Sequence, residues 1–306
     1  MSVVITRNLI VAGLWCTPDH ANDTFLLARK RGRCYDLALS VVKGLADSFI
    51  DVPDARSNAL NCLFSAPIAK HLEGIRPHLP ESSVSTIGFI GGTGPEGRGL
   101  AVRFAAAGHN VVIGSRDASR ATEAADEVKT ILSEVSDAAD VRGALNADAV
   151  SASDIVFIAV PYAGMMASLE QLSCSLTGKI CVNVIAPLSF AGGIPAAAPP
   201  EIGSAAEEAA QYTPDLRWVA GLHTLSARDL LKPTSSLDTD AIICGDDNDA
   251  KLTVSELLSE VPGLRPVDAG SLQSARYLEG ATALLININK RYKSHASLTI
   301  SGLNVG

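Results

Sequence analysis

The sequence contains no Cys-x-x-C pair and no apolar run long enough to cross a bilayer. Its six cysteines are irregularly spaced, so neither a zinc site nor a disulfide framework is indicated, and we expect reduced thiols in a cytoplasmic protein. A membrane-spanning helix needs about 20 consecutive apolar residues, so no membrane insertion is expected. Residues 9–15 form a short apolar stretch. No small-residue cleavage site follows it, which favours a core strand over a weak signal peptide.

Aromatic and charged residues are also scarce. They make up 5% and 19% of the 306 residues, against 47% hydrophobic residues, a composition typical of an α/β enzyme. The formal net charge of -8 argues against nucleic acid as a partner, because phosphate binding depends on clustered Lys and Arg. The length allows two or three packed units.

The composition changes near residue 80. Residues 1–80 hold nine Lys and Arg against seven Asp and Glu, whereas the remainder holds 16 against 26. We therefore treat residues 1–82 as an N-terminal extension of unknown role. Amphipathic helices are expected within residues 26–50 and 67–79. The basic cluster at residues 29–33 is better explained as a solvated helix face than as a phosphate or partner contact.

From residue 83 onward, apolar strands alternate with helices. Strands are expected at residues 87–90, 110–113, 155–160, 179–185, 218–222 and 241–244, with helices at 100–107 and 118–132 between the first of them. This order predicts an α/β fold with a doubly wound parallel sheet. Helices expected at residues 251–260 and 274–289 predict a small, mainly helical C-terminal domain. The expected division is residues 83–220 and 221–306.

A glycine-rich turn follows the first of these strands and opens a helix. Gly92, Gly94 and Gly97 satisfy G-x-G-x-x-G in the context that a dinucleotide-binding motif requires. The first glycine permits a tight turn, the second lets the backbone approach a pyrophosphate, and the third lets the helix pack on the strand. A purely structural turn is the alternative. The motif predicts a Rossmann-type domain whose cofactor contacts include Gly92, Thr93, Gly94, Pro95, Glu96 and Gly97.

The second strand ends in Ser115 and Arg116, where an NAD-binding protein places the acidic residue that holds the ribose hydroxyls. A hydroxyl and a guanidinium would instead bind a 2'-phosphate, so NADP(H) is the predicted cofactor. Arg120 can add charge, although a solvated helix position explains it equally well. Asp117 would weaken the preference if it pointed into the pocket instead of capping the following helix.

Residues 87–116 (IGFIGGTGPEGRGLAVRFAAAGHNVVIGSR) resemble the opening of the NADPH-dependent reductases of the deazaflavin coenzyme F420. Three later segments resemble segments of the same family in the same order: GLHTL at residues 221–225, CGDD at residues 244–247, and LRPVDAGSLQSAR at residues 264–276. The resemblance covers most of the chain after residue 83. It is far more specific than the glycine motif alone.

This resemblance implies hydride transfer between NADP(H) and F420, with the two rings stacked in a cleft between the Rossmann domain and the C-terminal domain. Two groups follow sheet strands at their carboxyl ends and are expected to border the nicotinamide: Val160, Pro161 and Tyr162, and then Ala186 and Pro187. His223, Thr224 and Leu225 match the family's Leu-His-Thr segment, and His223 is expected beside the deazaflavin; a hydrogen-bonded core histidine is the alternative. A homodimer is also implied, and no metal is.

Two other functions stay open at this point. An NADPH-dependent reductase of a small imine or carbonyl compound would need a proton donor near the hydride acceptor, for which His223 and Tyr162 are available. A non-catalytic NADP(H)-sensing protein would bind the cofactor without turnover. Arg265 and Asp268 are expected to form an ion pair that stabilises a turn.

Overall fold

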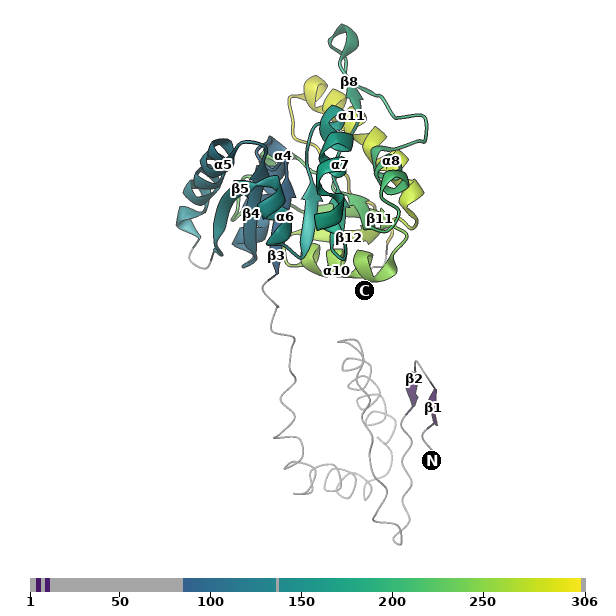
Figure 1. The fold of residues 1–306 in the computed structure, drawn as a ribbon. Helices are drawn as coiled ribbons and strands as arrows, with labels where there is room; N and C mark the ends of the chain where they lie inside the picture. The colour runs from purple at the N-terminus through teal and green to yellow at the C-terminus, as the bar shows by residue number, and fades with distance from the viewer. Residues whose placement is uncertain (1–3, 7–8, 12–84, 136–137, 304–306) are drawn as a thin grey trace, which may run out of the picture. The chain divides into compact units, whose positions relative to one another are not determined.

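The computed structural model describes residues 4–6, 9–11, 85–135 and 138–303 (Figure 1). The chain divides into two compact units, residues 1–81 and 82–306. In the first unit, β1 (Val4–Thr6) pairs antiparallel with β2 (Leu9–Val11), which covers the first three residues of the early apolar stretch. The helices expected at residues 26–50 and 67–79 lie outside the described residues.

The described part of the second unit is built on an eight-stranded sheet with the order β12-β11-β10-β7-β6-β3-β4-β5. β11 (Thr239–Gly245) runs antiparallel to β10, and β12 (Leu264–Asp268) runs parallel to β11. The other strands run parallel to one another and confirm the predicted doubly wound sheet: β3 (Thr86–Ile90), β4 (Asn110–Ser115), β5 (Val141–Leu145), β6 (Ile155–Ile158), β7 (Ile180–Asn183) and β10 (Arg217–Gly221).

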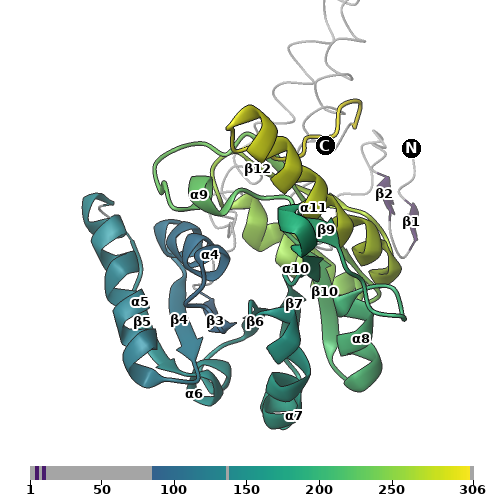
Figure 2. The ribbon, with the colours of Figure 1, turned by 90° about the horizontal axis from the view of Figure 1, so that it is seen from above.

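Helices cover both faces of this sheet (Figure 2). One face carries α4 (Pro95–Ala106), α5 (Ala118–Ile131), α9 (Ala227–Leu230) and α10 (Asn248–Ser259). The other carries α6 (Asn146–Ser151), α7 (Met165–Leu176), α8 (Ala205–Tyr212) and α11 (Ala275–Tyr292). Successive strand residues enter different core clusters, as Phe157 and Ile158 do. Because both faces are covered, the strands appear in the sequence as continuous apolar runs.

Three phenylalanines hold α4 over the centre of the sheet. The ring centroid of Phe157 on β6 lies 5.2 Å from that of Phe89 on β3 and 5.2 Å from that of Phe104 on α4. All three side chains are fully buried. The contact fixes the helix above the junction of β3 and β6, so its N-terminus is held at the carboxyl end of β3.

A buried arginine ties α4 to the segment that follows β10. Arg103 is 1% exposed, and its guanidinium donates to the carbonyl oxygens of Asp229 (2.6 Å), Leu230 (3.0 Å), Ser235 (2.6 Å) and, at 3.5 Å, Pro233. A planar fork of donors suits such a set of converging carbonyl groups. The segment after β10 is therefore anchored to the helix that begins at the glycine-rich turn.

Arg103→Lys is expected to lower the free energy of unfolding by about 2 kcal/mol, because an ammonium cannot satisfy all of these buried carbonyl groups. Urea unfolding of the variant and the parent protein measures the change. The matched control is Arg120→Lys on the exposed face of α5, which should stay within about 0.5 kcal/mol of the parent. Equal losses in the two variants would contradict this role of Arg103.

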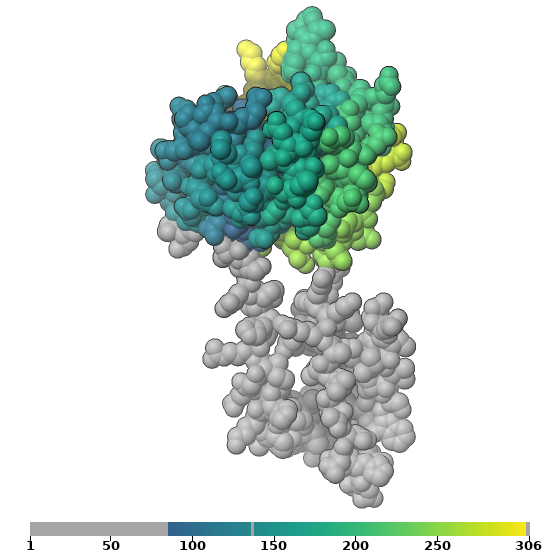
Figure 3. All heavy atoms as spheres, in the orientation of Figure 1, coloured from purple at the N-terminus to yellow at the C-terminus, as the bar shows by residue number. Residues whose placement is uncertain are grey.

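A hairpin projects from the second unit after β7. β8 (Leu188–Ser189) pairs with β9 (Ala196–Ala197), and the turn between them stands out from the surface (Figure 3). Two side chains of α11 hold it: Asn287 Nδ2 donates to the carbonyl oxygen of Pro195, and Lys290 Nζ to that of Gly193, each at 2.8 Å. These two contacts fix the turn of the hairpin against the last helix.

Residues 221–306, expected as a mainly helical domain, hold α9, α10 and α11 but also give β11 and β12 to the common sheet. The expected boundary at residue 220 falls within β10, and a separate C-terminal domain stays a prediction. The ion pair expected between Arg265 and Asp268 is wrong: Arg265 binds Asp240 at 2.6 Å, and Asp268 binds Lys251 at 2.9 Å. None of the helices within the described ranges is both long and apolar enough to cross a membrane.

Candidate functional site

The carboxyl ends of the parallel strands bring the expected site residues to one edge of the sheet. β3 leads into the glycine-rich turn, and β4 ends at Ser115. The segments that follow β6, β7 and β10 begin at Ala159, Val184 and Leu222. The connections from β3 and β6 leave towards opposite sides of the sheet, and these two strands are neighbours. In an open α/β sheet, a crevice forms at such a switch point and binds ligands.

The glycine-rich turn has the geometry of a phosphate cradle. A Cβ on Gly97 would lie 2.7 Å from the Gly92 Cα atom, so the helix can approach the turn only because residue 97 is glycine. A Cβ on Gly94 would meet no atom within 4 Å, so this backbone faces open space. A Cβ on Gly91, which has a φ of 72°, would lie 2.5 Å from a methyl group of Val160. The turn therefore adjoins the segment after β6.

Helix α4 presents an uncapped N-terminus to this space. Gly94 is its N-cap residue and Pro95 its first residue, and no side chain caps it. The first N–H groups of a helix have no intrahelical partner and, together with the helix dipole, attract anions. Proline has no N–H group, but at the first helical position that group would lack an intrahelical partner in any case. Thr93 and Glu96, two of the expected cofactor contacts, lie just before and just after the start of α4.

At the end of β4, the direction of Asp117 is settled by its hydrogen bonds. Its carboxylate accepts from the backbone N–H groups of Ser119 (2.9 Å) and Arg120 (3.4 Å) and from the Ser119 hydroxyl (2.6 Å), and these bonds lower the pKa of Asp117. Asp117 therefore caps α5. Ser115 is buried beside it, and Arg116 and Arg120 are exposed.

Beyond β6, Tyr162 is already engaged with an acidic side chain. Its hydroxyl donates to Glu208 Oε2 on α8 at 2.8 Å. Burial, followed by this hydrogen bond and the charge of Glu208, raises the pKa of Tyr162 to about 12. Pro161 before it is exposed. After β7, Ala186 is half-buried and Pro187 is buried.

Beyond β10, His223 is a buried and neutral imidazole. It is 7% exposed, Thr224 and Leu225 beside it are also buried, and its carbonyl oxygen accepts from Thr282 Oγ1 of α11 at 3.0 Å. Within the described residues neither ring nitrogen has a hydrogen-bond partner, although the ring approaches the backbone of Ile185. Burial lowers the pKa of His223 to about 4. The ring thus presents unpaired polar atoms between the ends of β7 and β10.

Protein stability should fall in mild acid because of His223. Its folded pKa lies below the ordinary value, so between pH 6.5 and 4 the unfolded chain binds the proton that the folded chain excludes, and stability is lost as the pH falls. At pH 5 the loss is about 2 kcal/mol. His223→Gln should remove this part of the pH dependence in urea unfolding at pH 7 and pH 5. An unchanged difference between the two pH values would contradict the buried neutral state.

Comparisons with known proteins identify the family. Residues 86–187 match the family model described as NADP oxidoreductase coenzyme F420-dependent. The F420-dependent NADP reductase of Methanothermobacter marburgensis is 38% identical over 222 residues, which cover 71% of this chain and 98% of that protein. The chain belongs to this family.

Two further similarities extend over the same share of the chain. The F420-dependent NADP reductase of Methanocaldococcus jannaschii is 35% identical over 223 residues, covering 72% of this chain and 99% of that protein. A solved structure described as a putative F420-dependent NADP reductase from Arthrobacter sp. FB24 is 27% identical, with a TM-score of 0.61, and covers 71% of this chain and 99% of that chain. The reductase family's fold is thus matched over nearly its whole length.

This member of the F420-dependent NADP oxidoreductase family has three residues that fix segments of the candidate site and that were not predicted from the sequence. Asn146 Oδ1 accepts from the Gly91 N–H at 3.2 Å and so supports the glycine-rich turn. Glu208 holds Tyr162, and Arg103 holds the segment after β10. A charge within the apolar pattern of α4 was the signal for Arg103. Neither Asn146 nor Glu208 carries such a signal, because each acts through a contact distant in sequence.

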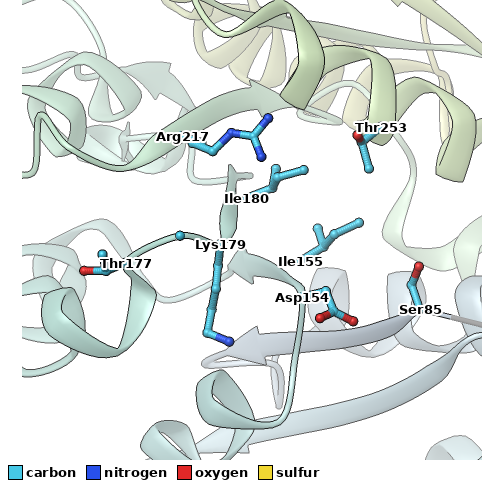
Figure 4. Close-up of a pocket in the computed structure, with 9 residues that line it drawn as sticks. Ser85, Asp154, Ile155, Thr177, Lys179, Ile180, Arg217 and Thr253 are labelled. Carbon is cyan, nitrogen blue, oxygen red and sulfur yellow. The ribbon is translucent and has the colours of Figure 1, made fainter.

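The described residues also line two pockets. One, of about 570 Å³, lies at the opposite edge, among the first residues of β6, β7 and β10 (Figure 4). Its cations are engaged: Lys179 Nζ donates to the Ser153 carbonyl oxygen at 2.5 Å, and Arg217 binds Asp247 at 2.6 Å. The other, of about 180 Å³, lies beside Arg103 and includes Leu225. No cluster of His, Cys, Asp or Glu suited to a metal ion occurs in the described part of the chain.

Proposed function

We propose that this protein is an F420-dependent NADP reductase, which transfers a hydride between NADP(H) and the deazaflavin coenzyme F420. The observation that carries the proposal is membership of the family, with 98% of a reductase of that name matched by this chain. The nicotinamide and deazaflavin rings supply the hydride chemistry when they are bound. The chain supplies binding, orientation and exclusion of water.

The residues at the ends of β3 and β4 fit an NADP(H) molecule. The open space at Gly94 and the uncapped start of α4 provide room and N–H donors for the pyrophosphate, to which the turn from Gly92 to Gly97 contributes its backbone. Ser115 and Arg116 would hold the 2'-phosphate by a hydroxyl and a guanidinium. Because Asp117 caps α5, its carboxylate does not oppose that phosphate from within the pocket.

The ends of β6, β7 and β10 would receive the two rings. We assign the nicotinamide border to Val160, Pro161 and Tyr162 together with Ala186 and Pro187, and the deazaflavin border to His223, Thr224 and Leu225. Most of these groups are apolar, and Pro187, Thr224 and Leu225 are buried, so the lining excludes water from the transfer step. The unpaired ring nitrogens of His223 offer a hydrogen bond to a bound ring.

The other two functions are not favoured. Reduction of an imine or carbonyl compound needs a proton donor, yet Tyr162 has a pKa of about 12 and donates to Glu208, and His223 is neutral with a pKa of about 4. Direct hydride transfer between two cofactor rings needs neither as an acid. A protein that only senses NADP(H) would not explain why this chain matches reductases of the family over nearly their whole length.

We further propose a cytoplasmic homodimer. Cys181 and Cys244 are free, buried thiols, as expected where disulfides are not formed. The projecting hairpin and the last helix expose large apolar side chains, among them Phe190 and Ile194 on the hairpin and Leu284 on α11. Such groups typify interaction surfaces. Light scattering of the parent protein and of Phe190→Ser with Ile194→Ser tests this assembly, and a monomeric parent would overturn it.

The function is tested by mixing the protein anaerobically with NADPH and oxidised F420 and following the loss of the deazaflavin's visible absorbance. We expect NADPH-dependent bleaching, and much slower bleaching with NADH. Bound NADPH without any bleaching would remove F420 reduction from first place.

A further inference from the structure

The pocket of about 180 Å³ shares a residue with the expected deazaflavin border, because Leu225 belongs to both. Thr239, which also lines the pocket, begins β11. Since β11 runs antiparallel to β10 with Ile243 opposite Gly221, this end of β11 lies beyond the carboxyl end of β10. The pocket therefore lies at the same edge of the sheet as the candidate site. It has room for several water molecules, each of which takes about 30 Å³ in the liquid.

The lining of this pocket is positively charged, in a chain whose formal net charge is -8. Among the residues that the structure describes, the lining holds Arg103 and Lys232 against one acid, Asp229. The Asp229 carboxylate is bound to Lys232 Nζ at 2.7 Å, whereas the Arg103 guanidinium donates to carbonyl oxygens only and has no ion pair there. Asp238 lies outside the lining and accepts from the Ser236 hydroxyl. The surplus of positive charge attracts an anion.

His295 adds a hydrogen-bond donor to the lining. Its Nε2 atom lies 3.0 Å from Arg228 Nη1, and because a guanidinium can only donate, Nε2 must accept. The ring is therefore neutral and carries its proton on Nδ1, which has no hydrogen-bond partner within the described ranges. The hydroxyl groups of Ser235 and Ser297 also lack partners in that part of the chain. The pocket thus offers unused donors.

Several carbonyl oxygens beside the pocket are already occupied. Those of Asp229 and Ser235 accept from Arg103, each at 2.6 Å. The Leu298 carbonyl oxygen accepts from Thr239 Oγ1 at 2.8 Å and from the Asp240 N–H at 3.1 Å. Unused donors, occupied acceptors and a positive charge together suit a phosphate or a carboxylate, which offers strong acceptors and a negative charge.

We propose that this pocket binds an anionic group, a phosphate or a carboxylate, on the side chain of the deazaflavin substrate whose ring is expected at Leu225. The proposal rests on the proposed function for the identity of the substrate. Coenzyme F420 bears such groups on the chain attached to its ring, whereas its riboflavin-like core bears none. The subsite binds F420 away from the atoms that exchange the hydride, so it lowers KM and leaves kcat unchanged.

Steady-state reduction of F420 and of its core at saturating NADPH tests the subsite. Lys232→Gln should raise KM for F420 by about 10-fold, the loss expected for one hydrogen bond to a charged group, and leave KM for the core unchanged. Lys232→Arg keeps the charge and should restore most of the affinity for F420. The matched control is Lys129→Gln on α5. Lys129 is also exposed and also bound to an aspartate three residues earlier, so this variant should behave as the parent.

A second variant changes the lining without removing a charge. Ser297→Ala removes one unused donor, so it should raise KM for F420 by a few-fold and leave KM for the core unchanged. Thermal unfolding of both variants at the temperature of the parent shows that they are folded.

The contrary results separate the subsite from the proposed function. Reduction of F420 with an unchanged KM in Lys232→Gln would overturn the subsite and leave the proposed function intact. An equal rise in KM for the core would place the effect at the ring and would also overturn the subsite. Reduction of neither compound by the parent protein, despite bound NADPH, would refute the proposed function and the subsite with it.

Discussion

Gly94→Ala is expected to weaken NADP(H) binding by on the order of 1000-fold while the protein stays folded. An added Cβ meets no atom of the chain within 4 Å, and the φ of -76° suits alanine, so the fold has room for it. The same methyl group would occupy the space through which a pyrophosphate approaches the backbone. Loss of two charge-assisted hydrogen bonds costs about 4 kcal/mol, which corresponds to a loss of affinity on the order of 1000-fold.

Fluorescence titration with NADPH and thermal unfolding together measure this effect. The free energy of unfolding should fall by no more than about 1 kcal/mol, the difference between glycine and alanine at an N-cap. Gly97→Ala provides the contrast, because its Cβ would lie 2.7 Å from the Gly92 Cα atom and must displace backbone. That variant should lose both stability and binding. Normal NADPH affinity in Gly94→Ala would show that the phosphates bind elsewhere.

Arg116→Ala is expected to raise the dissociation constant of NADPH by about 50-fold and to leave that of NADH almost unchanged. Removal of a charge-assisted contact to a phosphate costs about 2 kcal/mol or slightly more. NADH has no 2'-phosphate and does not make this contact, so its affinity does not depend on it. The exposed position of Arg116 at the end of β4 means that the fold does not depend on it. Titration of both cofactors against the variant and the parent measures the preference directly.

Arg120→Ala is the matched control for Arg116. It removes the same charge one helical turn later on α5, where the side chain is also exposed. A loss of NADPH affinity much smaller than that of Arg116→Ala separates a specific phosphate contact from a general effect of positive charge. Equal weakening of NADPH and NADH binding by Arg116→Ala would contradict the assignment of the 2'-phosphate to this residue.

Local sequence rules predicted the dinucleotide-binding half well. A strand, three spaced glycines and a helix have few ways to fold, and the alternation of strands with helices is sufficient to predict a parallel sheet. Where the sequence allowed two directions for Asp117, the capping preference of Asp at a helix start proved correct. These features depend on residues close together in the chain.

Contacts between distant residues were not predictable in the same way. Arg103 meets carbonyl groups about 130 residues away, and the partner of Tyr162 is an acid on α8, 46 residues along the chain. The reversal of β11 against β10 is a choice of topology that strand periodicity does not encode. The buried, unpaired state of His223 likewise results from packing between β7, β10 and α11. The resemblance of residues 221–225 to a segment of the family therefore predicted His223 as a site residue but did not predict its lowered pKa.

In the proposed reaction, a hydride passes directly between two cofactor rings at the carboxyl edge of this sheet. The most direct test uses NADPH carrying deuterium at the transferred position of the nicotinamide, with oxidised F420 in ordinary water, and determines the mass of the reduced deazaflavin. We expect the deuterium from one face of the nicotinamide to be retained in the reduced deazaflavin. Reduced F420 without deuterium, or no reduction of F420 by protein that binds NADPH, would contradict it.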